Sequence, residues 1–199
     1  NAGDISFEEL RKAASCRVVT YGMESDADYR AEDVSLFVNG SAFTLVHGGK
    51  RYKVETNLSA KYNLYNLLGA IAAMHEAGME IEDMLPKLSH ISQIDGRMEI
   101  IDKGQDFTVI VDYAHTPDGF EKVFEYAKEV SGNGRIYSVF GCAGKRDKVK
   151  RKVLGQIAAK YCDRVFVTEE DPRDETAEGI AEMILSGMEE DCGVFISDR

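Results

Sequence analysis

The sequence predicts an α/β protein in two parts: a β-meander with two helices, then a Rossmann-like domain with a mostly parallel sheet. Three observations support this prediction. Residues 17–56 contain short β-rich runs separated by turn residues. From Gly96 onward, apolar runs alternate with helical patterns, and three polar loops follow successive strands of that second part.

The first part begins with four β-rich runs, at residues 17–21, 35–39, 42–47 and 52–56. The pairs Asn39-Gly40 and Gly48-Gly49 separate neighbouring runs. Such pairs between apolar alternations are a strong hairpin signal. We therefore expect an antiparallel meander.

Two helices should follow the meander. Residues 61–77 place Leu64, Leu68 and Ile71 at helical spacing and are followed by Gly78, which is a frequent helix terminator. A second, shorter helix is expected at residues 82–91.

A domain boundary is expected near residue 96. Residues 89–97 lack strong periodicity and are our candidate hinge. This gives one domain at residues 1–95 and a second at residues 96–199.

Strands and helices alternate in the second part. The apolar runs lie at residues 107–111, 135–140, 164–168 and 193–196, and the helical patterns at 117–130, 148–161 and 177–188. Pro117 suits the first turn of a helix. This alternation predicts right-handed βαβ units and a parallel sheet. Continuous apolar strands are typical of a sheet covered on both faces.

The composition limits the possible partners. The formal net charge is −11, so there is no surplus of cations for binding nucleic acid or an anionic membrane. No run approaches about 18 apolar residues, so we expect no membrane span. The four cysteines show no CxxC spacing. This argues against a zinc site or a disulfide framework and favours a reducing compartment.

Several motifs of well-known enzyme classes are absent. The chain has no GxxxxGKS or GxxxxGKT phosphate loop, no HExxH and no GxSxG. It starts at Asn1 without a methionine and stops just after an apolar run. We therefore expect it to be part of a longer protein.

Three polar loops should carry the chemistry, because ligands of open parallel sheets lie outside the carboxyl ends of the strands. These loops are residues 112–117, 141–148 and 169–173. Asp112 could bind Mg²⁺ through water or hold a hydroxyl, or it could simply be a carboxylate near a helix start. His115 could contact a nucleotide or donate a proton, or it could be structural.

Cations gather in the second loop and in the helix that follows it. Gly141 and Gly144 would let backbone amides approach an anion, and Arg146 offers a planar fork for a carboxylate. Cations at a helix N-terminus oppose the helix macrodipole. We therefore expect an anionic group to accompany residues 145–152; a solvated basic helix start is the alternative.

An asparagine pair and two arginines are less specific candidates for ligand binding. Asn63 and Asn66 lie three apart on one helical face, and carboxamides can pair with an adenine edge; they could equally be polar surface residues. Arg97 follows Gly96 in what could be an ordinary turn. Arg173 follows a proline that could aim its guanidinium at a ligand or merely form a surface turn.

Taken together, the motifs resemble the Mur ligases. They occur in that family's order: Asn63-Leu-Tyr-Asn66, Gly96-Arg97-Met98-Glu99, Asp112-Tyr-Ala-His-Thr-Pro117, Val139-Phe-Gly-Cys142 with Arg146-Asp147, Lys150-Arg151, and Asp171-Pro172-Arg173. Thr20-Tyr21-Gly22 and residues 27–31 also resemble the family's central domain. The resemblance covers nearly the whole chain. It is strongest with the branch that adds the third amino acid of the peptidoglycan stem peptide.

The resemblance implies an ATP-dependent, cytoplasmic and monomeric ligase with Mg²⁺ as cofactor. Its substrates would be UDP-N-acetylmuramoyl-dipeptide and an amino acid. The chain would hold the end of a truncated central domain and most of the C-terminal domain. The phosphate loop and a carbamylated lysine that helps to bind Mg²⁺ would precede Asn1, so we expect this chain alone to be inactive.

The resemblance also implies roles for single residues. The nucleotide set, near adenine, ribose and phosphates, comprises Asn63, Asn66, Arg97, Asp112 and His115. The acceptor set, which would bind the incoming amino acid, comprises Arg146, Glu170, Asp171, Pro172 and Arg173. No residue of this chain is assigned as catalytic or as a metal ligand.

Two departures leave the acceptor open. Members that add diaminopimelate typically read Asp-Asn-Pro-Arg where this chain has Glu170-Asp171-Pro172-Arg173, and Gly-Gly-Asp is more usual at Ala143-Gly144-Lys145. Arg173 favours meso-diaminopimelate, and L-lysine is the competitor. The alternatives are another ligase of the wider superfamily that includes folylpolyglutamate synthetases, or a non-catalytic module that binds an amino acid or a nucleotide.

Overall fold

The computed structural model describes residues 1–24, 26–91, 93–189 and 191–197. The chain forms two compact units, Asn1–Val111 and Asp112–Arg199. Each unit contains its own hydrophobic core. Among the described residues, no helix combines the length and the apolar character that crossing a membrane requires.

A four-stranded sheet is the framework of the first unit. Its strands follow the chain order β1 (Tyr21–Gly22), β2 (Tyr29–Phe37), β3 (Gly40–His47) and β4 (Lys50–Thr56). The pairs β2–β3 and β3–β4 are antiparallel, which confirms the meander. Of the first predicted run, residues 17–21, only Tyr21 belongs to β1, and β1 pairs with β2 in parallel, so the meander prediction is wrong for that run. Apolar alternation identifies a strand but not the direction of its partner.

Two tight turns set the register of the meander. Gly48 and Gly49 join β3 to β4, and their φ angles are 56° and 79°. A type I′ hairpin turn needs positive φ at both central residues, which explains the glycine pair. In the β2–β3 hairpin, Phe37 pairs with Gly40. The turn residues there are Val38 and Asn39, one position before the predicted Asn-Gly pair.

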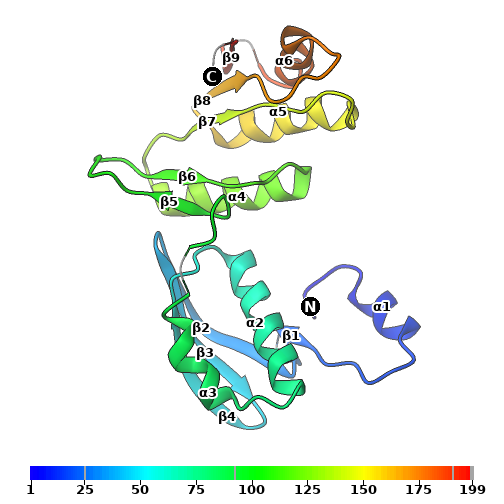
Figure 1. Cartoon of the computed structure of the whole chain (residues 1–199), viewed down its shortest axis with the longest axis vertical. Helices are drawn as coiled ribbons and strands as arrows, with labels where there is room; N and C mark the ends of the chain where they lie inside the picture. Colours follow the sequence, from blue (N-terminus) through cyan, green and yellow to red (C-terminus); the bar gives the residue numbers. More distant parts are fainter. Residues whose placement is uncertain (25, 92, 190, 198–199) are drawn as a thin grey trace. The chain divides into compact units, whose positions relative to one another are not determined.

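Helices pack on this sheet. α2 (Lys61–Glu76) lies across it, with Leu64, Leu68 and Ile71 buried (Figure 1). α3 (Ile81–Leu88) contacts β4 and α2. It begins one residue before the predicted range and ends at Leu88 rather than at residue 91. α1 (Phe7–Ala13) has no buried residue, which is why no apolar stripe predicted it.

A short hairpin ends the first unit. β5 (Glu99–Ile101) pairs antiparallel with β6 (Val109–Val111). We expected residues 107–111 to open the parallel sheet, and this pairing corrects that expectation. A short apolar run is compatible with either orientation. The candidate hinge at residues 89–97 precedes the hairpin, and its Ser92 lies outside the described residues.

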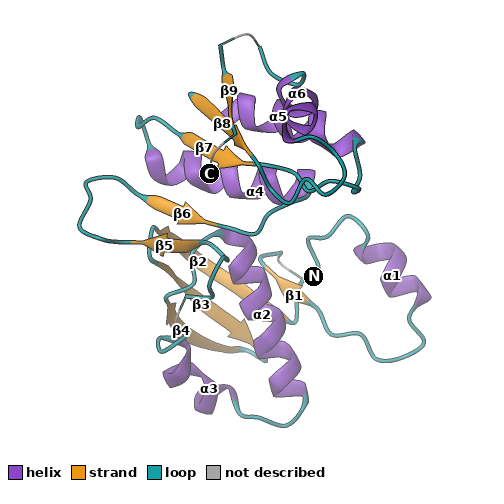
Figure 2. Ribbon diagram, turned by 45° about the horizontal axis from the view of Figure 1, so that its top comes forward, coloured by secondary structure: helices purple, strands orange, loops and turns teal. Residues whose placement is uncertain are grey.

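The second unit has the predicted βαβ order. Its strands β7, β8 and β9 form a parallel sheet in that order. Helices connect them, and α4 precedes the sheet (Figure 2). The elements are α4 (Pro117–Ser131), β7 (Tyr137–Phe140), α5 (Val149–Tyr161), β8 (Arg164–Thr168), α6 (Ala177–Leu185) and β9 (Gly193–Ile196).

The core of this unit lies between the sheet and its three helices. Phe120 of α4 contacts Phe140 of β7 with ring centroids 4.9 Å apart, and Val165, Val167 and Leu154 are buried in the same cluster. The opposite sheet face differs from our expectation of cover on both faces. Tyr137 and Val139 are 54% and 68% exposed there, and no described helix of this unit covers them.

Candidate functional site

The three polar loops predicted to carry the chemistry lie together in the second unit. Strands β7 and β8 are parallel neighbours, so their loops leave the sheet side by side. The backbone N–H of Gly144 donates to the carbonyl of Asp171 at 3.0 Å, which ties these two loops. The Lys150 ammonium donates to the carbonyl of His115 at 2.9 Å and thereby links the loop of residues 112–117 to α5.

Two glycines permit this close approach. A Cβ at Gly144 would lie 1.9 Å from the carbonyl oxygen of Pro172, and one at Gly141 would lie 2.3 Å from that of Thr168. We expected both glycines to present amides to an anion. At Gly144 the amide is instead bonded to the neighbouring loop, so this glycine serves loop-to-loop contact.

The same two loops contain unusual backbone conformations. Lys145, Asp171 and Arg173 have φ angles of 53°, 32° and 54°. A non-glycine residue in a sparsely populated conformation costs about 1–3 kcal/mol and persists only where surrounding contacts enforce it. Three such residues in two touching loops indicate that strong contacts hold these loops.

One of these contacts is an ion pair between Arg151 and Glu175. The Arg151 side chain, from the first turn of α5, is fully buried. Its Nη1 and Nη2 donate to the Glu175 carboxylate at 2.8 and 3.0 Å in a fork arrangement. Nη2 also donates to the carbonyl of Ala143 at 3.3 Å. Charge-assisted, bidentate bonds of this type are the strong ones in proteins.

The Glu175 carboxylate interacts with two further hydrogen-bond donors. The backbone N–H of Lys145 donates to it at 2.7 Å, and the Lys148 ammonium lies 3.0 Å away. The hydrogen bond from Arg151, followed by those from Lys145 and Lys148, holds the pKa of Glu175 well below its usual range. Lys145 also pairs with Asp174. The anion that we expected beside these cations is therefore supplied in large part by the chain itself.

The acceptor set lies on the exposed side of these loops. Arg146, Glu170, Asp171 and Arg173 are exposed, and Pro172 is half-buried. The Arg173 Nε donates to the Asp171 carboxylate at 3.2 Å. The Arg146 guanidinium forms no hydrogen bond, ion pair or ring contact with the residues that the structure describes, so its charge is available to a ligand.

Two members of the nucleotide set belong to the second unit. The Asp112 carboxylate accepts a hydrogen bond from the N–H of Ala114 at 2.7 Å. His115 is exposed, its Nδ1 lies 3.1 Å from the carbonyl oxygen of Tyr113, and the two rings are edge-on. The loop therefore has a defined shape that presents His115 to solvent.

The other three members belong to the first unit. The Asn63 side chain donates to the carbonyl of Ser59 at 2.9 Å, so one carboxamide of the asparagine pair supports the start of α2. Asn66 is exposed. Arg97 is also exposed and sits in a turn in which the N–H of Gly96 donates to Glu99 at 2.8 Å.

Two family models match the chain. The Mur ligase glutamate ligase domain matches residues 96–199, and the Mur ligase middle domain matches residues 1–74. The first of these matches alone covers more than half of the chain.

The chain belongs to the Mur ligase family.

Similar Mur ligases are found among curated proteins. A UDP-N-acetylmuramoyl-L-alanyl-D-glutamate--2,6-diaminopimelate ligase of Clostridium acetobutylicum is 40% identical over 100% of this chain and 42% of its own length. A UDP-N-acetylmuramyl-tripeptide synthetase of a Roseiflexus species is 39% identical over 95% of this chain and 37% of its own length. The chain thus spans about two fifths of these relatives.

A solved Mur ligase has a similar fold. The structure of a UDP-N-acetylmuramoyl-L-alanyl-D-glutamate--2,6-diaminopimelate ligase is 29% identical, with a TM-score of 0.61. The match covers 98% of this chain and 42% of that one. Mixed α/β architecture, with a meander followed by a mostly parallel sheet, is therefore confirmed.

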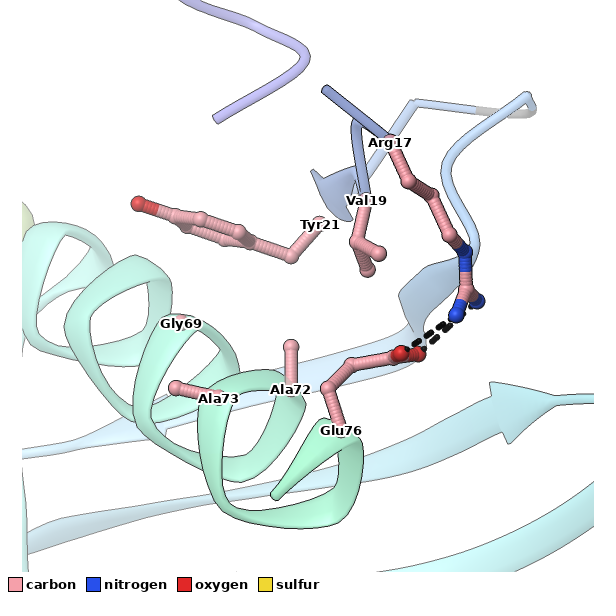
Figure 3. A pocket seen from close by; sticks show the side chains of 7 residues that line it. All are labelled: Arg17, Val19, Tyr21, Gly69, Ala72, Ala73 and Glu76. Atoms are coloured by element: carbon pink, nitrogen blue, oxygen red, sulfur yellow. Dashed lines mark hydrogen bonds and ion pairs between the residues drawn. The ribbon is translucent and has the colours of Figure 1, made fainter.

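A cavity in the first unit lies apart from all the residues predicted for the site. It has a volume of about 400 Å³ and is lined by α2 and by residues 17–21 (Figure 3). Arg17 and Glu76 form an ion pair at its edge, with 2.8 Å between Nη1 and Oε2. Neither the nucleotide set nor the acceptor set contributes to its lining.

The Mur ligase resemblance implies Mg²⁺, for which carboxylate ligands would be expected. No group of three His, Cys, Asp or Glu side chains is close enough to hold a metal ion in the part of the chain that the structure describes. Asp112, the first metal candidate, uses a carboxylate oxygen for the N–H of Ala114. The described residues therefore do not form a Mg²⁺ site by themselves.

Sequence reasoning missed the residues that hold the loops of this Mur ligase chain in place. Arg151 and Lys150 were recognised only as part of a motif, and Glu175 was not considered. A signal did exist: cations crowd the unfavourable end of α5. What the sequence lacked was any periodic relation between residues 151 and 175 that would reveal their pairing.

The depressed pKa of Glu175 predicts a pH dependence. A carboxyl group whose pKa is lower in the folded state stabilises that state above its unfolded pKa, near 4.5. This contribution is lost as the pH falls further towards the folded pKa. We expect the melting temperature of the wild type to exceed that of Glu175→Gln at about pH 6, and the difference to shrink towards about pH 3. Thermal melts across this pH range test it; a constant difference would contradict the assignment.

Proposed function

We propose that the full-length protein is a cytoplasmic, ATP-dependent ligase of peptidoglycan synthesis. It would add an amino acid to UDP-N-acetylmuramoyl-L-alanyl-D-glutamate. The observation that carries the proposal is the contact between the two strand-end loops that bear the acceptor set, with Arg146 exposed on one loop and Asp171 and Arg173 exposed on the other. The printed names of the relatives at 39% and 40% identity support the substrate class.

The proposed reaction has two steps. The terminal phosphoryl group of ATP passes to a carboxylate oxygen of the nucleotide peptide, giving an acyl phosphate and ADP. The amine of the acceptor then attacks the acyl carbon, the tetrahedral intermediate expels phosphate, and the amine loses a proton. Catalysis of this kind depends on positioning and on stabilising charge. Mg²⁺ would stabilise negative charge on the phosphates. Residues other than those that the structure describes would bind it.

Within this scheme the acceptor set positions the amine. A guanidinium can bind a carboxylate through two parallel hydrogen bonds, and the exposed Arg146 is suited to the carboxylate of the amino acid. The same proposal includes a domain boundary between residues 95 and 96. It also includes the nucleotide set, the acceptor set and a monomeric state. Asp112 and His115 would lie on the nucleotide side.

The identity of the acceptor depends on residues 171 and 173. Arg173 could bind a second carboxylate, which favours meso-diaminopimelate. Its Nε, however, already donates to Asp171, and an aspartate adds a negative charge that an asparagine would not. That charge favours an acceptor with a distal ammonium group. Both meso-diaminopimelate and L-lysine carry one, so both remain in the proposal.

Phosphate release by the full-length protein tests this function. We expect release to require ATP, UDP-N-acetylmuramoyl-dipeptide and one amino acid from a panel that includes meso-diaminopimelate and L-lysine. Turnover with a folate and glutamate instead would assign the protein to another ligase group. Binding of an amino acid or nucleotide without any phosphate release would indicate a non-catalytic module.

A further inference from the structure

We propose that Arg151 and Glu175 are a positioning pair: they fix the two loops that carry the acceptor set, and thereby determine the affinity for the incoming amino acid. The inference rests on the function proposed above. Neither residue would touch a substrate, because the Arg151 side chain is fully buried.

The location of the pair supports this role. Arg151 belongs to α5, and Glu175 belongs to the loop between β8 and α6. Through its hydrogen bond to Ala143, Arg151 also holds the loop after β7. One guanidinium therefore connects both loops to the helix behind them. Its Nη1 additionally lies 3.2 Å from the Met183 sulfur of α6.

The pair is adjacent in sequence to the residues that it would position. Glu175 accepts the backbone N–H of Lys145, the residue before Arg146. Its own N–H donates to the carbonyl of Pro172 at 3.0 Å. The backbone of the Asp171–Arg173 turn is thus held from both sides, by Gly144 and by Glu175. This explains how the positive φ angles of Lys145, Asp171 and Arg173 are maintained.

The ion pair offers the loops more than stability. A buried ion pair is often no more stabilising than well-packed apolar side chains of similar volume. The apolar alternative would fill the space but could not accept the Lys145 N–H or donate to Ala143. The ion pair supplies directional bonds to both loops, and direction is what a binding loop requires.

The decisive experiment compares stability with acceptor affinity in the full-length enzyme. Three proteins are needed: wild type, Glu175→Gln, and the double variant Arg151→Met/Glu175→Leu, which replaces the charges by apolar side chains. We expect the double variant to melt close to the wild type. Its KM for the acceptor should nevertheless be about 10- to 100-fold higher than that of the wild type. A small displacement of positioning groups produces an effect of this size. The KM for ATP should change less than about twofold.

A matched control isolates the loops. Lys160 and Glu121 form an ion pair with 2.6 Å between Nζ and Oε1, at the opposite end of α5. Glu121→Gln removes an equivalent charge without touching the loops, and its acceptor KM should match the wild type. If the acceptor KM of the double variant recovers together with its melting temperature, the pair is only structural and the proposal fails. An equal rise in the control would also overturn it.

Hydrogen exchange separates this proposal from the proposed function. In the double variant we expect faster amide exchange in residues 141–148 and 169–176, with α4 unchanged. Unaltered exchange in both loops would refute the positioning role, whatever the enzyme catalyses. Faster exchange in a protein that shows no turnover with UDP-N-acetylmuramoyl-dipeptide would support the role of the positioning pair in holding the loops. The same result would reject the proposed substrate.

Discussion

Arg146→Ala should raise the KM for the acceptor amino acid by about 10- to 100-fold, because each hydrogen bond to a charged group contributes about 1.5–3 kcal/mol. The KM for ATP should stay nearly constant. The guanidinium is exposed and forms no hydrogen bond or ion pair with the described residues, so its loss should leave the melting temperature almost unchanged. Steady-state assays of the full-length enzyme, with each substrate varied in turn, measure this separation.

Two variants serve as controls for Arg146. Lys152→Ala removes an exposed cation from the same helix start and should leave both KM values close to those of the wild type. Arg146→Lys keeps the charge but loses the planar fork, so its acceptor KM should be intermediate. Equal increases in the KM for ATP and for the acceptor would remove Arg146 from the acceptor set.

Gly144→Ala should strongly destabilise the contact between the two loops of the second unit. The added Cβ would lie 1.9 Å from the carbonyl oxygen and 2.6 Å from the carbonyl carbon of Pro172. Both atoms are backbone, so the two loops must separate and the Gly144–Asp171 hydrogen bond must lengthen. We expect a loss of about 1–3 kcal/mol in unfolding free energy, together with a large rise in the acceptor KM.

Gly69→Ala is the matched control for this steric argument. Its Cβ would come within 3.0 Å of the Tyr21 ring, which is a side chain and can move. We expect a smaller change in melting temperature and no change in the acceptor KM. Thermal melts and acceptor titrations of both variants decide the matter. A Gly144→Ala protein with wild-type stability and affinity would show that the loops are not in close contact.

The sequence predicted the elements of this fold better than their pairing. Arg164–Thr168 and the start of α4 at Pro117 were found to the residue, since apolar runs and proline placement are local signals. The direction of β1 and the partner of β6 were not found, because both depend on contacts between distant parts of the chain.

The candidate site shows the same division. The exposed loops and their charged residues were predictable, because polar residues after buried strands mark the ligand-binding edge of a parallel sheet. The internal use of the charges was not. Glu175 forms ion pairs with cations for which the sequence indicated no partner. The Asn63 carboxamide donates a hydrogen bond to the carbonyl of Ser59. Arg146 therefore stands out only once the internally paired cations are known.

The positive φ angle of Asp171 has an evolutionary consequence. Among non-glycine residues, asparagine and aspartate adopt such a backbone most readily, whereas β-branched residues do not. Exchange between these two side chains at position 171 therefore costs little backbone strain, yet it changes the charge that the proposed function places beside the acceptor. Under that proposal, a lineage could change acceptors through this one position while the architecture of the loop is inherited intact.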